Sequence, residues 1–399
     1  MTSMPSAFRD MPPDVPTRAP STVDALAATV RELRDAVQPM RFVGSGAWLQ
    51  GGGPFVDAAP ISLRALAGVV DYTPGDLVIT VRAGMTLREL SAITAEHGQM
   101  FATAPYGGPQ GSPDSTIGAI IATSASAPLP LDDLAVRDLV LGLTVVTGTG
   151  AITHAGGRVV KNVAGFDLVR LHTGAWGTLG AIAEVSLRLH AIPAHDILLE
   201  GSVTPELGDA LPPLVANRAP VPMQVLLTPG AAPRLVARVT GNAARVQGLR
   251  AQLGQLGMRD ITDAPHDTLS TLRETPVDAV VLRLRTALSD AVPFVRAARQ
   301  AFPEATLSYA PQRGTLRVVM PGEASADAPS DALSDALSAL SRLATSFGAS
   351  HRIAIAIDQG RMQYPARTPL EAGIKAALDP DDLCNRVATM APAPAPLPV

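Results

Sequence analysis

Residues 71–87 of this 399-residue chain are DYTPGDLVITVRAGMTL. The Pro-Gly pair favours a tight turn, and the flanking β-prone residues predict strands at 68–72 and 77–82. Thr86 is followed three residues later by Glu89, and this capping-box spacing predicts the start of a helix. We therefore expect a β-hairpin that runs directly into a helix.

Working outward toward the N-terminus, apolar residues at helical spacing predict a helix over 23–37, followed by a strand at 41–43. The strand enters the glycine-rich loop 44–54, GSGAWLQGGGP. Backbone N–H groups in such a loop can bind phosphate, although a plain tight turn explains a lone glycine-rich loop equally well. The loop lacks the third glycine of the Rossmann fingerprint, and the chain has no GxxxxGK[ST], which disfavours both nucleotide-binding classes.

Toward the C-terminus, three segments could carry chemistry. Small residues crowd 112–124, SPDSTIGAIIATS, where either a flat ring or a packed helix could approach the backbone. Residues 156–171, GGRVVKNVAGFDLVRL, contain Lys161 and an Asp167–Arg170 pair, which either form ion pairs or present positive charge to an anion. Residues 174–182 form a glycine-spaced turn that enters a strand.

Strand patterns dominate the rest of the chain, with a hairpin at 139–147 and 151–154 and an alternating strand at 181–190. Pro193 marks a plausible domain boundary. Beyond it we expect strands at 197–203, 223–227, 235–240, 279–285, 315–320 and 353–357, and helices at 243–256, 290–302 and 330–347. This interleaving predicts an α+β sheet with helices on one face.

Composition excludes several classes of protein. Hydrophobic residues make up 47% and the formal net charge is -4, so no chain-wide basic field indicates nucleic acid or anionic lipid. The single cysteine, Cys384, excludes a disulfide framework and an Fe–S cluster held by several cysteines of this chain. No signal peptide or membrane-spanning run is apparent, so we expect a cytoplasmic protein, with peripheral docking on the inner membrane left open. Residues 1–20 and 391–399 are expected to be disordered, and no metal site is expected.

Taken in order, these segments resemble the FAD-binding domain of the vanillyl-alcohol-oxidase (PCMH) type over about 42–193. The match combines the loop at 44–48, the hairpin at 71–87, the TIGA turn at 116–119 and the VRDLVLG strand at 136–142. Residues 160–171, VKNVAGFDLVRL, are most similar to the FAD-binding subunits of glycolate oxidase complexes. Residues 377–385, ALDPDDLCN, resemble the closing segment of the same family.

The resemblance implies an α+β fold in which a two-subdomain FAD-binding domain (21–193) precedes a smaller ferredoxin-like α+β domain (194–390). It implies FAD held non-covalently, since the loop contains no His or Cys for a covalent link. The implied pyrophosphate contacts are the backbone amides of Gly44, Ser45, Gly46, Ala47 and Trp48. The residues implied at the flavin and diphosphate are Thr116, Gly118, Ala122 and Thr123, with Asp138 near the ribityl chain and Gly180 and Ile182 near the adenine.

The implied activity is the FAD-dependent oxidation of glycolate, a 2-hydroxy acid, to glyoxylate. The chain would act with a second FAD-linked subunit and an Fe–S subunit. Two departures bear on this. Ala119 stands where the family has a second glycine, and the histidine-rich metal site of the stand-alone D-2-hydroxy-acid dehydrogenases is missing. No catalytic residue is assigned, and a stand-alone dehydrogenase or a non-catalytic scaffold subunit stays open.

Overall fold

A computed structural model of the protein describes eleven stretches of the chain: 17–46, 58–102, 114–124, 129–131, 134–158, 167–203, 221–261, 279–285, 291–320, 354–359 and 367–386. Several sequence-based expectations lie outside these residues: Ala47, Trp48, Lys161, the helix at 330–347, the tail 391–399 and most of the N-terminal segment.

The first unit begins with a small α/β subdomain. Helix α1 (Val23–Asp35) starts at the N-cap Thr22, whose hydroxyl accepts a hydrogen bond from the N–H of Ala25. It packs on the parallel pair β1 (Met40–Val43) and β2 (Ala59–Ser62). The predicted helix at 23–37 and strand at 41–43 are confirmed within two residues.

The second subdomain is a five-stranded antiparallel sheet in the order β3-β4-β8-β6-β7. Its strands are β3 (Val69–Thr73), β4 (Val78–Arg82), β8 (Ala181–Arg188), β6 (Val140–Val146) and β7 (Ile152–Gly156). Helices α2 (Leu87–Ala95), α3 (Ile117–Thr123) and α4 (Leu168–His172) accompany it. Short strands β5 (Gln99–Met100) and β9 (His190–Ala191) pair beside it.

The hairpin and capping box predicted from residues 71–87 are both present. The hydroxyl of Thr86 accepts a hydrogen bond from the N–H of Glu89 at 3.1 Å, and the Glu89 carboxylate accepts one from the N–H of Thr86 at 2.6 Å. These bonds satisfy two of the N–H groups that the start of a helix leaves without partners. They fix α2 against the core that β4 and β8 share with α3.

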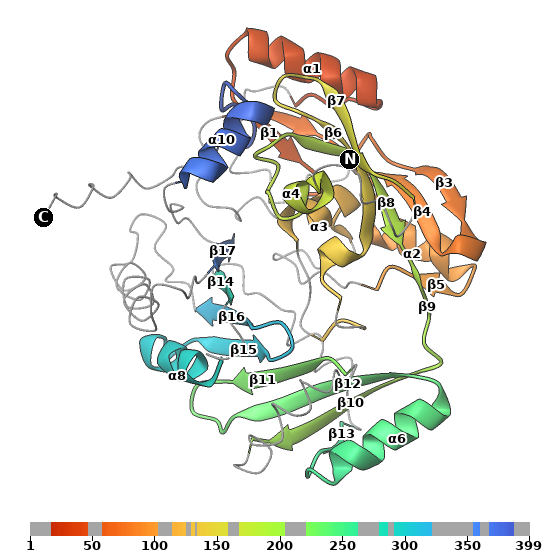
Figure 1. The fold of residues 1–399 in the computed structure, drawn as a ribbon, viewed down its shortest axis with the longest axis vertical. Helices are drawn as coiled ribbons and strands as arrows, with labels where there is room; N and C mark the ends of the chain where they lie inside the picture. Colours follow the sequence, from red (N-terminus) through yellow and green to blue (C-terminus); the bar gives the residue numbers. More distant parts are fainter. Residues whose placement is uncertain are drawn as a thin grey trace, which may run out of the picture.

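The second unit is one eight-stranded antiparallel sheet (Figure 1). Its strands are β10 (His195–Ser202), β11 (Met223–Leu227), β12 (Arg234–Gly241), β13 (Arg259–Asp260), β14 (Val280–Arg285), β15 (Thr306–Ala310), β16 (Thr315–Met320) and β17 (Ala354–Gln359). The order β13-β10-β12-β11 is 4-1-3-2 in chain order, and β17-β14-β16-β15 repeats it. Each half thus has the strand order of a ferredoxin-like unit, and β11 pairs with β15 to join the halves.

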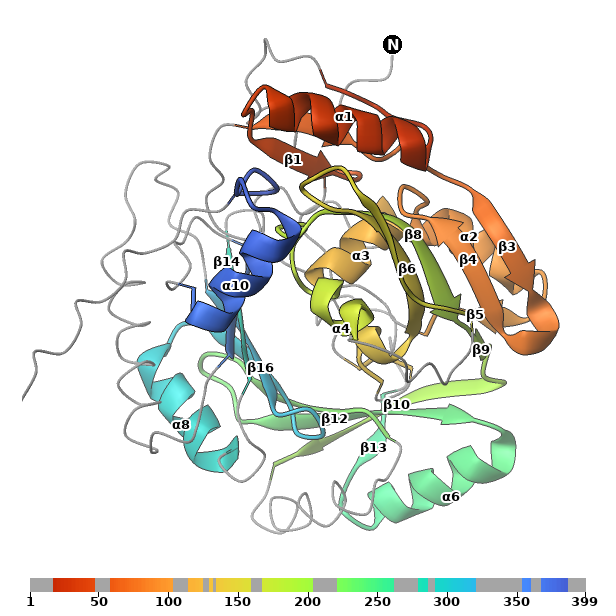
Figure 2. The ribbon, with the colours of Figure 1, turned by 45° about the horizontal axis from the view of Figure 1, so that its top comes forward.

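Two helices, α6 (Ala243–Gly254) and α8 (Ala291–Ala301), cover the face of this sheet that points away from the first unit (Figures 1 and 2). Phe294 and Ala298 of α8 pack on Leu282, Leu284 and other apolar side chains of the same face. The predicted α+β sheet with helices on one face is confirmed. Strand β15 was not predicted from the sequence. The opposite face is turned toward α3 and α4 (Figure 2).

The last described helix, α10 (Pro369–Leu378), returns to the first unit. Residue Cys384, just beyond it, forms a parallel bridge with Met40 of β1, and both Leu383 and Cys384 are buried in the core beneath α1. The end of the described chain is therefore an added edge of the first subdomain. No helix among the described residues is long and apolar enough to cross a membrane.

The histidine that ends α4 makes folding depend on pH. His172 is 3% exposed, and burial lowers its pKa from 6.5 to about 4, so the folded protein holds it neutral. The unfolded chain binds this proton below pH 6.5, so stability falls as pH drops from 6.5 toward 4. The full loss is about 3 kcal/mol.

We expect H172Q to flatten the fall in unfolding free energy over this pH range, measured by urea denaturation at several pH values. The matched control is H195Q, the same change at a histidine that is exposed in the fold. Equal pH slopes for H172Q and the wild-type protein would contradict the prediction.

Candidate functional site

The glycine-rich loop after β1 lies directly against the start of helix α3. A Cβ atom placed on Gly44 would come within 2.3 Å of the Thr116 hydroxyl oxygen. Thr116 is the N-cap of α3, and its hydroxyl accepts a hydrogen bond from the N–H of Ala119. Only a residue without a side chain allows this approach, so the structure brings together the first two segments that the sequence singles out.

The first N–H groups of α3 already have partners within the protein. Ile117 donates to the carbonyl of Met85 and Gly118 to that of Ala83, both at 2.8 Å. A Cβ atom on Gly118 would lie 2.7 Å from that of Ala83, so Gly118 serves close packing here. A phosphate at this place would therefore depend on donors other than these two groups.

Suitable donors lie beside the helix start. Among the described residues, none accepts a hydrogen bond from the N–H of Gly44, Ser45 or Gly46. The Ser115 hydroxyl is fully buried and has no hydrogen-bond partner among the described residues. A buried hydroxyl without a partner is costly, so a group that binds there has a physical reason to do so.

The turn before β8 meets the other end of α3. Gly174 donates to the carbonyl of Ile121 at 3.0 Å, and Trp176 donates to that of Ala122 at 2.8 Å. Gly180, with φ of +134°, follows this turn and enters β8, where Ile182 is buried in the core. The structure therefore joins the segment around Gly180 to α3 and, through it, to the loop at Gly44.

Asp138 lies elsewhere, at the end of a 3-10 turn (Val136–Asp138). Its carboxylate accepts a hydrogen bond from the N–H of Ala135 at 3.1 Å, which holds the turn before β6. The carboxylate also raises the pKa of Arg285 in the second unit through charge attraction. The cofactor contacts of all the residues implied by the resemblance stay predictions, including those of Asp138, Gly180 and Ile182.

These features fit FAD. Its pyrophosphate needs several N–H or O–H donors close to a backbone without side chains, and the loop at 44–46 together with Ser115 provides both. Ala119 and Ala122 of α3 are only partly buried, and their short side chains would let a flat ring come close to the helix.

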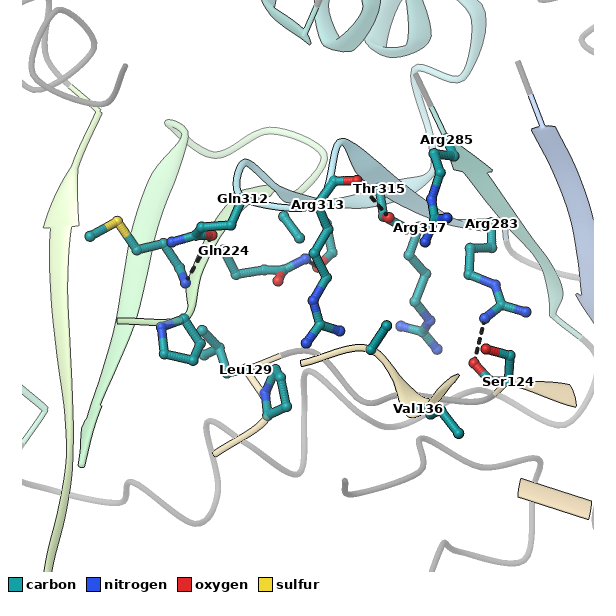
Figure 3. A pocket seen from close by; sticks show the side chains of 16 residues that line it. Ser124, Leu129, Val136, Gln224, Arg283, Arg285, Gln312, Arg313, Thr315 and Arg317 are labelled. Atoms are coloured by element: carbon teal, nitrogen blue, oxygen red, sulfur yellow. Dashed lines mark hydrogen bonds between the residues drawn. The ribbon is translucent and has the colours of Figure 1, made fainter. Parts of the chain in front are cut away.

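A cavity of about 80 Å³ lies between the two units (Figure 3). This is room for about six water molecules, enough for a small organic acid. Four arginines of the eight-stranded sheet, Arg283, Arg285, Arg313 and Arg317, line one side of it. The first unit contributes Ser124 and the apolar residues Leu129, Pro130, Ala135 and Val136. The second unit also contributes Pro222, Met223 and several polar side chains, among them Gln224, Ser308 and Gln312. Among the described lining residues, none is Asp, Glu or His.

Strand register explains why the arginines gather. In β14, Arg283 and Arg285 are two residues apart, so both side chains leave the same face of the sheet. Arg283 is directly opposite Arg317 of β16, and Arg285 is opposite Thr315. Arg313 adds to the row from the turn before β16. In Figure 3 these side chains point from the sheet toward Ser124 and Val136.

Two of the four arginines hold the units together. Arg283 donates to the carbonyls of Ser124 at 2.7 Å and Thr123 at 3.0 Å, and Arg313 donates to that of Leu134 at 2.7 Å. The acceptors of these three bonds are neutral carbonyl groups. A fifth arginine outside the cavity differs, since Arg238 pairs with the carboxylate of Asp196.

The pKa of Arg285 is lowered by burial and by the charges around it. Burial lowers its pKa, and the charges of Arg137, Arg283 and Arg313 lower it further, while Asp138 acts in the opposite direction. Because like charges repel each other, an anion bound among these arginines would reduce their mutual repulsion. The arrangement can therefore bind a carboxylate next to the C-terminal end of α3.

Sequence reasoning did not find these arginines. The signal was present in VVLRLR at 280–285, where arginine alternates with leucine. Such alternation predicts a strand with one polar face, but a solvent-exposed face gives the same pattern. Only the sheet order, which brings β14 beside β16 and turns both toward α3, distinguishes the two cases.

The glycine-rich loop against α3, with the eight-stranded sheet on its other side, is an arrangement that fits a two-domain flavoprotein. Residues 17–156 match the FAD binding domain family, and this part of the chain is an FAD-binding domain whose cofactor is FAD. The whole fold is similar to p-cresol methylhydroxylase, with a TM-score of 0.69 and 15% identity over 93% of this chain and 88% of that one. The expected PCMH-type fold is confirmed.

Two relatives are more similar to this chain in sequence than p-cresol methylhydroxylase is. The glycolate oxidase subunit GlcE of Escherichia coli K12 is 33% identical over 180 residues, 45% of this chain and 50% of that protein. The probable mitochondrial D-lactate dehydrogenase of Danio rerio is 34% identical over 194 residues, 47% of this chain and 37% of that protein. The match thus spans half or less of each relative's length.

The contact between Gly44 and Thr116 can be tested. We expect G44A to push the loop from α3 and to weaken FAD binding roughly tenfold or more, because the added methyl cannot fit at 2.3 Å. FAD affinity is measured by titrating the apoprotein and following the quenching of flavin fluorescence. Gly75 has no atom within 4 Å of its Cβ position, so G75A is the matched control. Equal FAD affinity in both variants would refute this role of Gly44.

Proposed function

We propose that this chain takes part in the FAD-dependent oxidation of a small 2-hydroxy acid. One observation carries the proposal: the arginine-lined cavity lies directly at the C-terminal end of α3, the helix assigned to the flavin. Arg283 lines the cavity and also donates to the carbonyls that end α3. A carboxylate bound by the arginines would thus lie beside the region where the sequence resemblance locates the flavin.

The relatives support the reaction class. GlcE is named as a glycolate oxidase subunit, and the Danio rerio protein as a probable D-lactate dehydrogenase. Glycolate and D-lactate are both 2-hydroxy acids with one carboxylate. A small cavity with several guanidinium groups fits this shared chemistry. We propose glycolate as the first substrate to test.

The chain's own residues would bind and orient the substrate. FAD, when bound, supplies the hydride acceptor. The N–H groups of Gly44, Ser45 and Gly46 and the hydroxyl of Ser115 would hold its diphosphate. Arg285 would bind the substrate carboxylate, with Arg317 adding positive charge from the neighbouring strand. Arg283 and Arg313 would fix the sheet against α3, so that the carboxylate and the ring keep one distance.

The wall opposite the arginines would control water. Leu129 and Val136 are buried apolar residues on that side. A dry wall strengthens the attraction between the carboxylate and the guanidinium groups, since the local dielectric is lower than that of water. Oxidation of the hydroxyl also releases a proton, and we propose that its acceptor belongs to another part of the assembly.

The assembly itself is a proposal. We infer a heteromeric complex with a second FAD-linked subunit and an Fe–S subunit that takes electrons onward. We expect it in the cytoplasm or peripherally on the cytoplasmic face of the inner membrane. The name of GlcE, a subunit of glycolate oxidase, supports the heteromeric form.

The reaction is tested by mixing the FAD-loaded chain anaerobically with glycolate, D-lactate or L-lactate, alone and with the proposed partners. Loss of the visible flavin absorption with a 2-hydroxy acid supports the proposal, and loss only after partner addition locates the proton acceptor in the complex. An oxidised spectrum under every condition, with FAD bound, would contradict it.

Arg285 provides the sharper prediction. Because an ionic hydrogen bond contributes about 1.5–3 kcal/mol, we expect R285Q to weaken binding of oxalate, a carboxylate inhibitor, by roughly 10- to 100-fold. FAD affinity should stay unchanged. Oxalate binding is read from the shift in the flavin spectrum. Arg259 has a side chain 84% exposed in β13, so R259Q serves as the control. Similar oxalate affinity in R285Q and R259Q would refute the assignment.

A further inference from the structure

The described chain ends in a segment that connects two of the FAD-related segments. We call residues 375–386 the C-terminal clasp: the end of α10, the turn after it and the bridge at Cys384. The clasp lies outside residues 17–156, which match the FAD binding domain family. It nevertheless packs between β1 and the turn at 174–180.

One clasp side chain contacts both of these elements. Asn385 accepts a hydrogen bond from the N–H of Phe42 through its Oδ1 atom, at 2.7 Å. It donates through Nδ2 to the carbonyl of Trp176, also at 2.7 Å. Phe42 is two residues before Gly44, and Trp176 is four residues before Gly180. The amide thus uses both of its ends to set the distance between two segments that the sequence resemblance assigns to the cofactor site.

The surroundings leave little freedom at this position. Asn385 is 7% exposed, and a Cβ atom on Gly177 would lie 2.7 Å from its Nδ2 atom. The backbone of Asn385 has a φ of 38°, in the left-handed region that asparagine tolerates better than most residues. Its N–H donates to the carbonyl of Met40 at 2.9 Å, which fixes the backbone as well as the side chain.

The rest of the clasp holds this arrangement in place. Lys375 is 5% exposed, and its Nζ donates to the carboxylate of Asp379 at 2.6 Å and to the carbonyl of Thr178 at 2.5 Å. Asp379 in turn accepts hydrogen bonds from the N–H groups of Leu383 and Cys384. A second anchor to the 174–180 turn is therefore independent of Asn385, so loss of the amide need not detach the clasp.

We propose that Asn385 is a positioning residue for FAD. Through Phe42 it holds the end of β1, and with it the N–H groups of Gly44, Ser45 and Gly46. Through Trp176 it holds the turn that ends α3 and leads to Gly180. Both bonds act on the geometry of the cradle, and neither contacts the cavity that holds the arginines. The inference rests on FAD binding alone and not on the oxidation of a 2-hydroxy acid.

Two variants of the full chain separate the side chain from the backbone. N385G removes both side-chain bonds and tolerates the φ of 38°. N385D keeps the acceptor for Phe42, loses the donor for Trp176 and brings a carboxylate against a carbonyl oxygen. The matched control is R386Q, at the exposed neighbouring position. For each protein we measure the dissociation constant of FAD by fluorescence quenching and the visible spectrum of the bound flavin.

Cys384 reports separately on whether the clasp stays in place. Its thiol is fully buried, and burial raises its pKa, so a thiol reagent should label the native protein very slowly. Labelling at the wild-type rate shows that the clasp remains docked in a variant. This readout separates a positioning effect from a general loss of structure.

The proposal predicts roughly tenfold weaker FAD binding in N385G, a similar or larger loss in N385D, and wild-type affinity in R386Q, with Cys384 labelling unchanged. It also predicts less resolved vibrational structure in the flavin spectrum of N385G. FAD affinity within twofold of wild type in N385G would overturn it. Weaker binding accompanied by fast Cys384 labelling would also overturn it, because Asn385 would then only dock the clasp.

Discussion

The backbone polar groups at the two ends of helix α3 are the constraint on which the site depends. The helix has only seven residues, so most of its N–H and carbonyl groups lack partners within it. Ala83 and Met85 accept the N–H groups at the start. At the other end, the turn at 174–176 satisfies Ile121 and Ala122, while Arg283 satisfies Thr123 and Ser124. Segments far apart in the chain thus converge on one short helix.

Because both units meet at this helix, its two ends have different roles. The start lies against the glycine-rich loop. There the N–H groups of residues 44–46 and the Ser115 hydroxyl have no acceptor among the described residues. The end faces the sheet and its arginines. A cofactor that is long and carries a diphosphate at one part and a flat ring at another matches this division. The positive charge of the cavity is then available to the substrate, because the arginines lie on the second unit and not beside the glycine-rich loop.

Sequence patterns predicted the parts that depend on neighbours in the chain. The Pro-Gly turn, the Thr86–Glu89 capping box and the strand at 181–188 are local, and all three are present. The expected alternation of this strand is not observed, because it is buried on both faces. Contacts over long separations were not predictable in this way. Arg283 lies 159 residues from Ser124, and Asn385 lies 343 from Phe42. The resemblance to a flavoprotein family located the cofactor segments, but neither the arginines nor the Asn385 bridge follows from a periodicity.

In the proposed arrangement, bound FAD faces the arginine-lined cavity from the side of α3. The most direct test is a crystal structure of the FAD-loaded protein in complex with oxalate. The account predicts the diphosphate at the loop of Gly44, the ring beside α3, and oxalate between the ring and Arg285. A flavin bound away from α3, or oxalate that makes no contact with the arginines of β14 and β16, would contradict it.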